Sequence, residues 1–188
     1  MHENRILIHK LKNFENINSN FLIITLMLFG SILLAISAKV QVPFWPVPMT
    51  MQTFVIFLIG MTYSVRLSFA TVAFYLCQGA IGLPVFATGG GIAYLVGPTA
   101  GYLYGMLFAS IVISYLANLG FSKTYFKATV SLLIGSAIIF SFGIIYLGYI
   151  IGFEKAVAAG LLPFIPSELF KIALAVALIP TLHKIITK

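Results

Sequence analysis

The sequence predicts an all-α membrane protein with six transmembrane helices and both termini in the cytoplasm. First, 61% of the 188 residues are hydrophobic and 8% are charged, whereas soluble domains are about 45–50% apolar and about 25% charged. Second, the apolar residues form runs close to the ~20 residues that a spanning helix needs. Third, most lysines and arginines lie between alternate runs, which is the pattern that orients helices in a bilayer.

The first two runs flank a proline-rich stretch. Residues 21–38 carry no charge and end at Lys39, and residues 49–64 are closed by Arg66. Between them, residues 42–48 contain three prolines. Proline lacks a backbone N–H and clashes with the preceding helical turn, so this stretch cannot be helix interior. We therefore expect two helices joined by an irregular segment.

Four further runs complete the chain. We expect helices over residues 67–82, 98–118 and 128–152, and a sixth helical region over 156–186. Residues 83–92, between the third and fourth helices, are rich in glycine yet too apolar for an ordinary solvated loop. Because proline suits the first turn of a helix, the last helix should start near the second of the three prolines that break the sixth region, Pro163, Pro166 and Pro180.

The basic residues predict the orientation. With the N-terminus inside, Lys39 and Lys155 fall outside, and Lys171 lies within the last helix. Residues 1–20 then form a polar cytoplasmic segment, and residues 21–188 form one membrane domain. The irregular segments all fall on the outer side, which predicts an outward-facing pocket. The remaining eight basic residues fall on the cytoplasmic side, namely Arg5, Lys10, Lys12, Arg66, Lys123, Lys127, Lys184 and Lys188.

The inventory of reactive residues excludes several classes of function. There is no aspartate, the three histidines lie near the ends, and Cys77 is the only cysteine. We therefore expect no metal site, no cofactor and no enzymatic activity. No Gly-Lys-Ser or Gly-Lys-Thr is present, so the chain has no phosphate-binding loop of the NTPase kind. The net charge of +7 is scattered between apolar runs, which argues against a nucleic-acid partner.

Glu168 and Lys171 are the strongest candidates for a ligand site. They lie three residues apart on one face of an otherwise apolar helix. Ionisable residues inside a membrane are costly and usually functional. Lys171 could bind an anionic group and Glu168 could accept hydrogen bonds. The alternative is an ion pair near the end of the helix.

Polar residues at the outer ends of two other helices are further candidates. Thr50, Gln52 and Thr53 begin the second helix, and Gln78 lies near the end of the third. A glutamine offers both donors and an acceptor, and so suits an amide or urea group. Thr50 could instead cap the helix, and Gln78 could form a hydrogen bond between helices.

Aromatic and small residues give weaker signals. Trp45, Phe86 and Tyr94 flank the outer segments and could stack against an apolar ring, or lie at the membrane interface. Gly90, within the run 89–91, permits close backbone approach to a ligand, or simply makes the loop flexible. On the first helix, the small residues Ser31 and Ala35 lie four apart. That spacing suits close contact with another helix of the bundle or of a partner.

Four blocks, taken in order, resemble one known family. Residues 46–53 (PVPMTMQT), 79–87 (GAIGLPVFA), 97–102 (GPTAGY) and 163–171 (PFIPSELFK) are similar to the motifs of BioY proteins. These are the biotin-binding S components of energy-coupling factor (ECF) transporters. The similarity covers about residues 21–186, nearly the whole chain.

The resemblance implies an ECF S-component bundle in a bacterial cell membrane. Such a protein captures biotin outside and releases it inside with a transmembrane coupling subunit and two ATPase subunits. Ser31 and Ala35 loosely match the family's docking motif for the coupling subunit. The family commonly has aspartate where Glu168 stands, so the carboxylate here extends one methylene further. An S component for another vitamin, or a solitary biotin transporter, remains an alternative.

The resemblance also implies roles for the candidate residues. The fused rings of biotin would lie among Trp45, Phe86 and Tyr94. The ureido group would be bound by a subset of Gln52, Gln78 and Glu168. The carboxylate would bind Lys171.

Overall fold

A computed structural model describes the backbone of residues 19–187 and the side chains of residues 20–179. The predicted cytoplasmic segment 1–20 lies outside this range except for its last two residues. The side chains of five of the eight basic residues on which the predicted orientation rests are not described either, namely those of Arg5, Lys10, Lys12, Lys184 and Lys188.

The described chain is almost entirely helical. It contains, in order, α2 (Ser19–Lys39), β1 (Gln41–Val42), β2 (Met49–Thr50), α3 (Gln52–Thr62), α4 (Val65–Ala80), α5 (Ile92–Leu95), α6 (Ala100–Asn118), η1 (Phe121–Lys123), α7 (Tyr125–Ile151), α8 (Phe153–Gly160), η2 (Leu162–Phe164) and α9 (Ile165–Thr187). The six predicted runs correspond to α2, α3, α4, α6, α7 and the α8–η2–α9 region.

Four helical stretches in the described part of the chain are long and apolar enough to cross a bilayer. They are Asn20–Lys39, Ala100–Asn118, Tyr125–Ile151 and Phe153–Ile179. The protein is therefore a multi-pass membrane protein. By contrast, α3 has 11 residues and α4 has 16, fewer than the ~20 that a spanning helix needs.

The second helix is shorter than the sequence predicts because its start pairs as a strand. Residues of β1 and β2 form an antiparallel pair, with Gln41 opposite Thr50 and Val42 opposite Met49. The proline-rich stretch makes the turn between them. Thus α3 begins at Gln52 instead of Met49, the predicted start.

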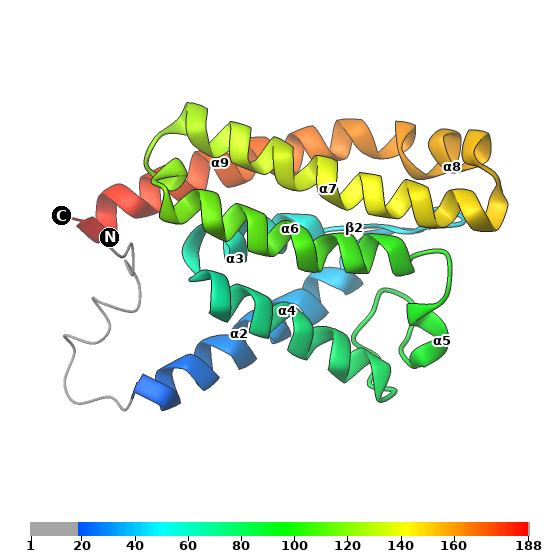
Figure 1. The fold of residues 1–188 in the computed structure, drawn as a ribbon, viewed down its shortest axis with the longest axis horizontal. Helices are drawn as coiled ribbons and strands as arrows, with labels where there is room; N and C mark the ends of the chain where they lie inside the picture. Colours follow the sequence, from blue (N-terminus) through cyan, green and yellow to red (C-terminus); the bar gives the residue numbers. More distant parts are fainter. Residues whose placement is uncertain (1–18, 188) are drawn as a thin grey trace.

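The helices surround α3, which lies at the centre of the bundle. It contacts α2, α4, α6, α7 and α9. Figure 1 shows α6 and α7 side by side, with α9 along the upper edge of the view and α2 and α4 on the lower side. The start of α2 and the end of α9 lie at one end of the molecule, and α5 and α8 lie at the other.

Ser31 and Ala35, the docking face expected from the sequence, differ in burial, and Ser31 faces inward. Ser31 is 1% exposed, and its hydroxyl donates a hydrogen bond to the side-chain oxygen of Gln78 on α4. At Gly30, a Cβ atom would lie 2.7 Å from a methyl group of Thr71. Ala35 is half-buried. Small side chains therefore let α2 approach α4 closely, and Ser31 is not available to a partner in this conformation.

Candidate functional site

A cavity opens between the four helices α3, α6, α7 and α9. Its empty volume, including the solvent-filled space at its opening, is about 500 Å³. The β2 strand, the loop before α5, α5 itself and η2 complete its wall. The lining residues are Val47, Pro48, Thr50, Gln52, Thr53, Ala87, Tyr94, Thr99, Tyr102, Leu103, Met106, Ile139, Phe140, Phe164, Glu168 and Lys171.

A hydrogen-bonded polar cluster lies on one side of this cavity. The Nζ of Lys171 is 3.1 Å from Oε2 of Glu168 and 3.0 Å from Oγ1 of Thr53. Thr53 in turn donates to Oε2 of Glu168 at 2.9 Å. From α7, Ser136 donates to Oε1 of Glu168 at 3.1 Å. Three helices thus hold one carboxylate in place.

The cluster is buried and electrically neutral, and some of its hydrogen-bond donors and acceptors are unused. Glu168 and Lys171 are each 4% exposed, so each charge depends on the other for compensation. An ammonium group has three N–H donors, of which Lys171 uses two, on Thr53 and Glu168. Oε1 of Glu168 accepts from Ser136 alone among the described residues, so it retains a lone pair. A neutral ligand with both donors and an acceptor matches this remaining capacity.

A second polar group extends from β2 to the first turn of α3. The side chain of Gln52, 4% exposed, donates to the hydroxyl of Tyr75 at 2.7 Å and accepts from Thr50 at 3.2 Å. Tyr75 donates onward to the backbone oxygen of Val85 at 3.0 Å. A glutamine amide has two N–H donors, so one of them remains for a ligand.

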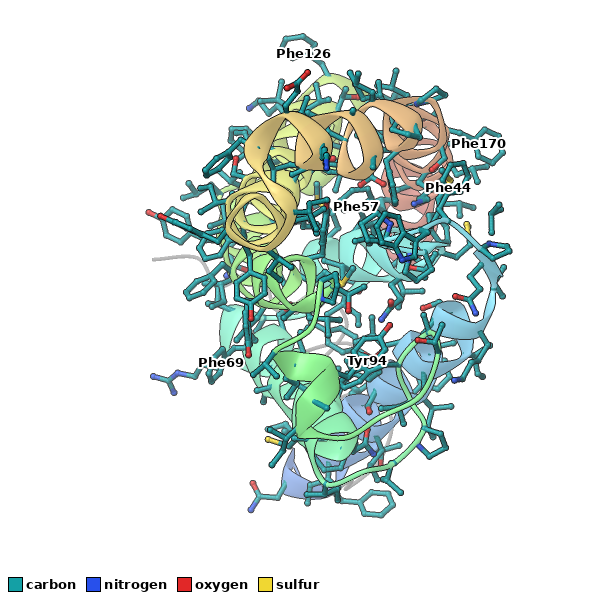
Figure 2. The ribbon with its side chains drawn as sticks, turned by 90° about the vertical axis from the view of Figure 1, so that its right-hand side faces the viewer. Phe44, Phe57, Phe69, Tyr94, Phe126 and Phe170 are labelled. Atoms are coloured by element: carbon teal, nitrogen blue, oxygen red, sulfur yellow. The ribbon has the colours of Figure 1, made fainter. Side chains whose placement is uncertain are left out.

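Aromatic rings form the apolar wall of the cavity. Tyr102 and Phe164 stack with ring centroids 6.4 Å apart, and Phe140 lies edge-on to both, 6.2 Å from each. The hydroxyl of Tyr102 donates to the backbone oxygen of Gly160 at 2.8 Å, which fixes that ring. In Figure 2, Phe57 and Tyr94 lie toward the middle of the molecule, whereas Phe126 lies at its outer edge.

Five of the residues proposed from the sequence come together here, and four do not. Thr50, Gln52, Tyr94, Glu168 and Lys171 all line the cavity. The four that do not are Trp45, Gln78, Phe86 and Gly90.

Each of the four has a different position. Trp45 is 82% exposed and lies in the turn of the hairpin, where an aromatic ring suits the membrane interface. Gln78 pairs with Ser31 between α4 and α2. Phe86 is 1% exposed and stacks behind the ring of Tyr94, at 4.8 Å. Gly90 packs against the backbone oxygen of Leu83 inside its own loop, where a Cβ would overlap it.

The structure adds Ser136 and Phe164 to the site, which the sequence did not single out. It also gives a definite contact to Thr53, which the sequence placed only in the polar start of the second helix. Thr53 bridges Glu168 and Lys171, and its position next to Gln52 was the one signal available. Ser136 is one of four Ser/Thr residues in the apolar run 128–152, and nothing in the sequence distinguishes it from the other three. Phe164 lies between the two prolines of η2 and α9, where helical periodicity is interrupted.

The described residues contain no group of three or more His, Cys, Asp or Glu side chains that could hold a metal ion. The site therefore consists of hydrogen-bonding side chains around one ion pair, with an aromatic wall. Such an arrangement can bind a small ligand and fix its orientation.

Comparison with known proteins places this arrangement in a family. The BioY family model matches residues 11–188. The chain belongs to the BioY family. A probable biotin transporter BioY of Rickettsia prowazekii is 37% identical over 82% of this chain and 80% of its own length. The biotin transporter BioY of Thermotoga maritima is 36% identical over 81% of this chain and 90% of its own.

A solved structure agrees with this assignment. The S-component for biotin from an ECF-type ABC transporter superposes with a TM-score of 0.79 and 26% identity, covering 90% of this chain and 94% of that one. The fold of this BioY-family chain is therefore that of an ECF S component. The family consists of transport proteins and not enzymes, which confirms the sequence-based prediction.

Proposed function

We propose that this chain is the biotin-binding S component of an ECF-type uptake transporter. The BioY family match and the biotin transporters among the relatives of this chain support biotin as the ligand. The chemical support is the electrically neutral cluster of Thr53, Glu168 and Lys171, which has unused hydrogen-bond donors and acceptors for a ligand.

The ureido ring of biotin suits this cluster. A ureido group is uncharged and combines N–H donors with a carbonyl acceptor. The free lone pair of Glu168 accepts from an N–H, and the remaining donors of Lys171 and Gln52 face a carbonyl. The fused rings then pack against Tyr94 and Phe164, which replace Trp45 and Phe86 in the role suggested by the sequence.

The ion pair also bears on the position of the biotin carboxylate. The sequence suggests that Lys171 binds it. In that arrangement two carboxylates share one buried ammonium, and the site acquires a net negative charge. Burying an uncompensated charge is costly. We therefore propose that the ureido ring lies at the pair and that the carboxylate lies toward the mouth of the cavity.

The topology and the partners are part of the same proposal. The two ends of the described chain lie at one end of the molecule, which supports six crossings with both termini in the cytoplasm. Arg66 lies in the first turn of α4, Lys123 is the last residue of η1, and Lys127 lies in the first turn of α7. These segments lie at that same end of the molecule. We propose that a transmembrane coupling subunit and two ATPase subunits supply the energy for release inside the cell. The chain then resides in the bacterial cell membrane.

Binding of labelled biotin to the purified chain tests the function, with other vitamins as competitors. Competition by biotin alone supports the proposal, and competition by a different vitamin alone refutes it. Biotin amide, which lacks the carboxylate charge, should compete within about threefold of biotin. A biotin methylated at a ureido nitrogen should lose about tenfold or more, the value of a hydrogen bond to a charged group. The reverse order would assign the carboxylate to Lys171.

The partners are tested in cells. Biotin uptake should require the coupling and ATPase subunits, and these should co-purify with the chain. Undiminished uptake in cells lacking them would instead make this chain a solitary transporter.

A further inference from the structure

The loop between α4 and α5, residues 81–91, is held over the cavity by side chains from outside it. We call it the cap loop. Ala87 of the cap loop and Tyr94 of α5, which directly follows it, both line the cavity. A ligand bound in the cavity therefore touches this part of the chain.

The cap loop is fixed by a hydrogen bond within it and by contacts with α4. The amide of Phe86 donates to the oxygen of Gly89 at 2.9 Å, and the amide of Gly91 donates to the oxygen of Gly79 at 2.7 Å. The side chain of Phe86 fills the space above Gly79, where a Cβ would overlap its ring. Phe86 is 1% exposed and contacts Tyr75 edge-on at 5.5 Å.

Three consecutive backbone oxygens of the cap loop accept hydrogen bonds from three other elements. Tyr75 of α4 donates to Val85 at 3.0 Å. Lys39, the last residue of α2, donates to Phe86 at 2.6 Å and more distantly to Ala87 at 3.4 Å. Gln41 of β1 donates to Ala87 at 3.2 Å.

Lys39 makes the shortest of these bonds and is the only one of the three donors that carries a charge. A charged donor forms a stronger hydrogen bond than a neutral one. Its position is also unusual, because Lys39 is one of two basic residues predicted to lie on the outer side. The positive-inside pattern disfavours a lysine there, whereas its bonds to the cap loop give it a structural use.

We propose that Lys39 is a positioning residue that holds the cap loop closed over the cavity and thereby sets the rates at which ligand enters and leaves. The inference rests on the proposed function, since it requires a ligand in this cavity. The bonds of Lys39 run from protein to protein. Weakening them therefore favours the open cap loop whether or not the cavity is filled, and both entry and exit should become faster.

Lys39→Met tests this, since it removes the donor and keeps the length of the side chain. In lipid nanodiscs, the association and dissociation rate constants of labelled biotin should both rise by about three- to tenfold, the value of a solvent-accessible charged hydrogen bond. The equilibrium constant should change less than either rate. Lys39→Arg, which retains donors, should stay within about twofold of the wild-type rates.

The matched control is Lys155→Met. Lys155 is exposed on α8, at the same end of the molecule, and makes no hydrogen bond to the cap loop among the described contacts. Its rates should equal those of the wild type. Unchanged rates in Lys39→Met would overturn the inference. A rise in the dissociation rate constant alone would also overturn it, because that is the result expected if Lys39 contacted the ligand directly.

Amide hydrogen exchange tests the same contact without a ligand. Lys39→Met should speed exchange in residues 83–91 and leave α6 unchanged; equal exchange in the cap loop refutes the proposal. Gln41→Leu serves as a second variant if Lys39→Met does not fold, with the same change expected in smaller degree. A wild-type chain that binds no biotin contradicts the proposed function and leaves the exchange result to decide the role of Lys39.

Discussion

Replacing Glu168 by glutamine should expose how strongly the buried ion pair is coupled. The variant keeps the size of the side chain but only one acceptor oxygen. Thr53 and Ser136 donate to different oxygens of the carboxylate, at 2.9 and 3.1 Å, so only one of them keeps its acceptor. The variant also removes the charge that faces Lys171 at 3.1 Å. Lys171 is 4% exposed, so its ammonium group is left without compensation inside the bundle.

The magnitude follows from the burial of the pair. Removing one partner of a buried ion pair costs about 3–5 kcal/mol, chiefly because the other charge is left unpaired. We expect Glu168→Gln to fall within this range. Lys171→Met should lower the free energy of unfolding by about the same amount, because it leaves the buried carboxylate of Glu168 unpaired. The double variant leaves no unpaired charge, and we expect it to cost only about 1–2 kcal/mol.

A double-mutant cycle measures this coupling. The free energy of unfolding of the wild type, both single variants and the double variant should be determined by denaturant titration in one detergent. The double variant should be more stable than the sum of the single effects predicts, by at least about 2 kcal/mol. Additive effects would show that the two charges do not stabilise each other and would refute the reasoning. All three variants should bind biotin at least about tenfold more weakly.

Three further predictions concern the rest of the site. Gly79→Ala should destabilise the protein by about 1–3 kcal/mol and weaken biotin binding, since its Cβ would overlap the ring of Phe86; thermal unfolding and equilibrium binding measure both. Trp45→Ala should leave biotin affinity within about twofold, whereas Phe164→Ala should lower it by about tenfold or more, as isothermal titration can compare. Gln52→Leu should weaken binding by about fivefold or more by removing a hydrogen bond, and equal affinity would remove Gln52 from the site.

The sequence allowed the central pair of the site to be predicted. Two charges three residues apart in an apolar helix are rare enough to stand out, and Glu168 and Lys171 do line the cavity. Their partners could not be predicted in the same way. Thr53 lies 115 residues from Glu168 in the chain, and Ser136 lies 32 residues from it. Only the packing of α3 and α7 against α9 brings these hydroxyls to the carboxylate.

Some residue patterns fit two structures equally well. Ser31 and Ala35 have the spacing of a helix–helix contact, but spacing does not say which helix is contacted, and α4 takes Ser31. Aromatic residues near the membrane surface suit both a ligand pocket and the interface. Trp45 is exposed and Tyr94 lines the cavity, although the sequence predicts both in irregular segments on the outer side.

The shortened second helix and the polar side of the cavity have one cause. Pro46 and Pro48 cannot be helix interior, so the chain leaves the hairpin as the strand β2 and α3 begins only at Gln52. A helix starting at Met49 would have carried Gln52 and Thr53 a full turn into its own body. Instead, both residues lie in the first turn of α3, beside the cavity, at the centre of the bundle. The stretch that looked in the sequence like a simple connection between two helices therefore determines where the hydrogen-bonding groups line the cavity.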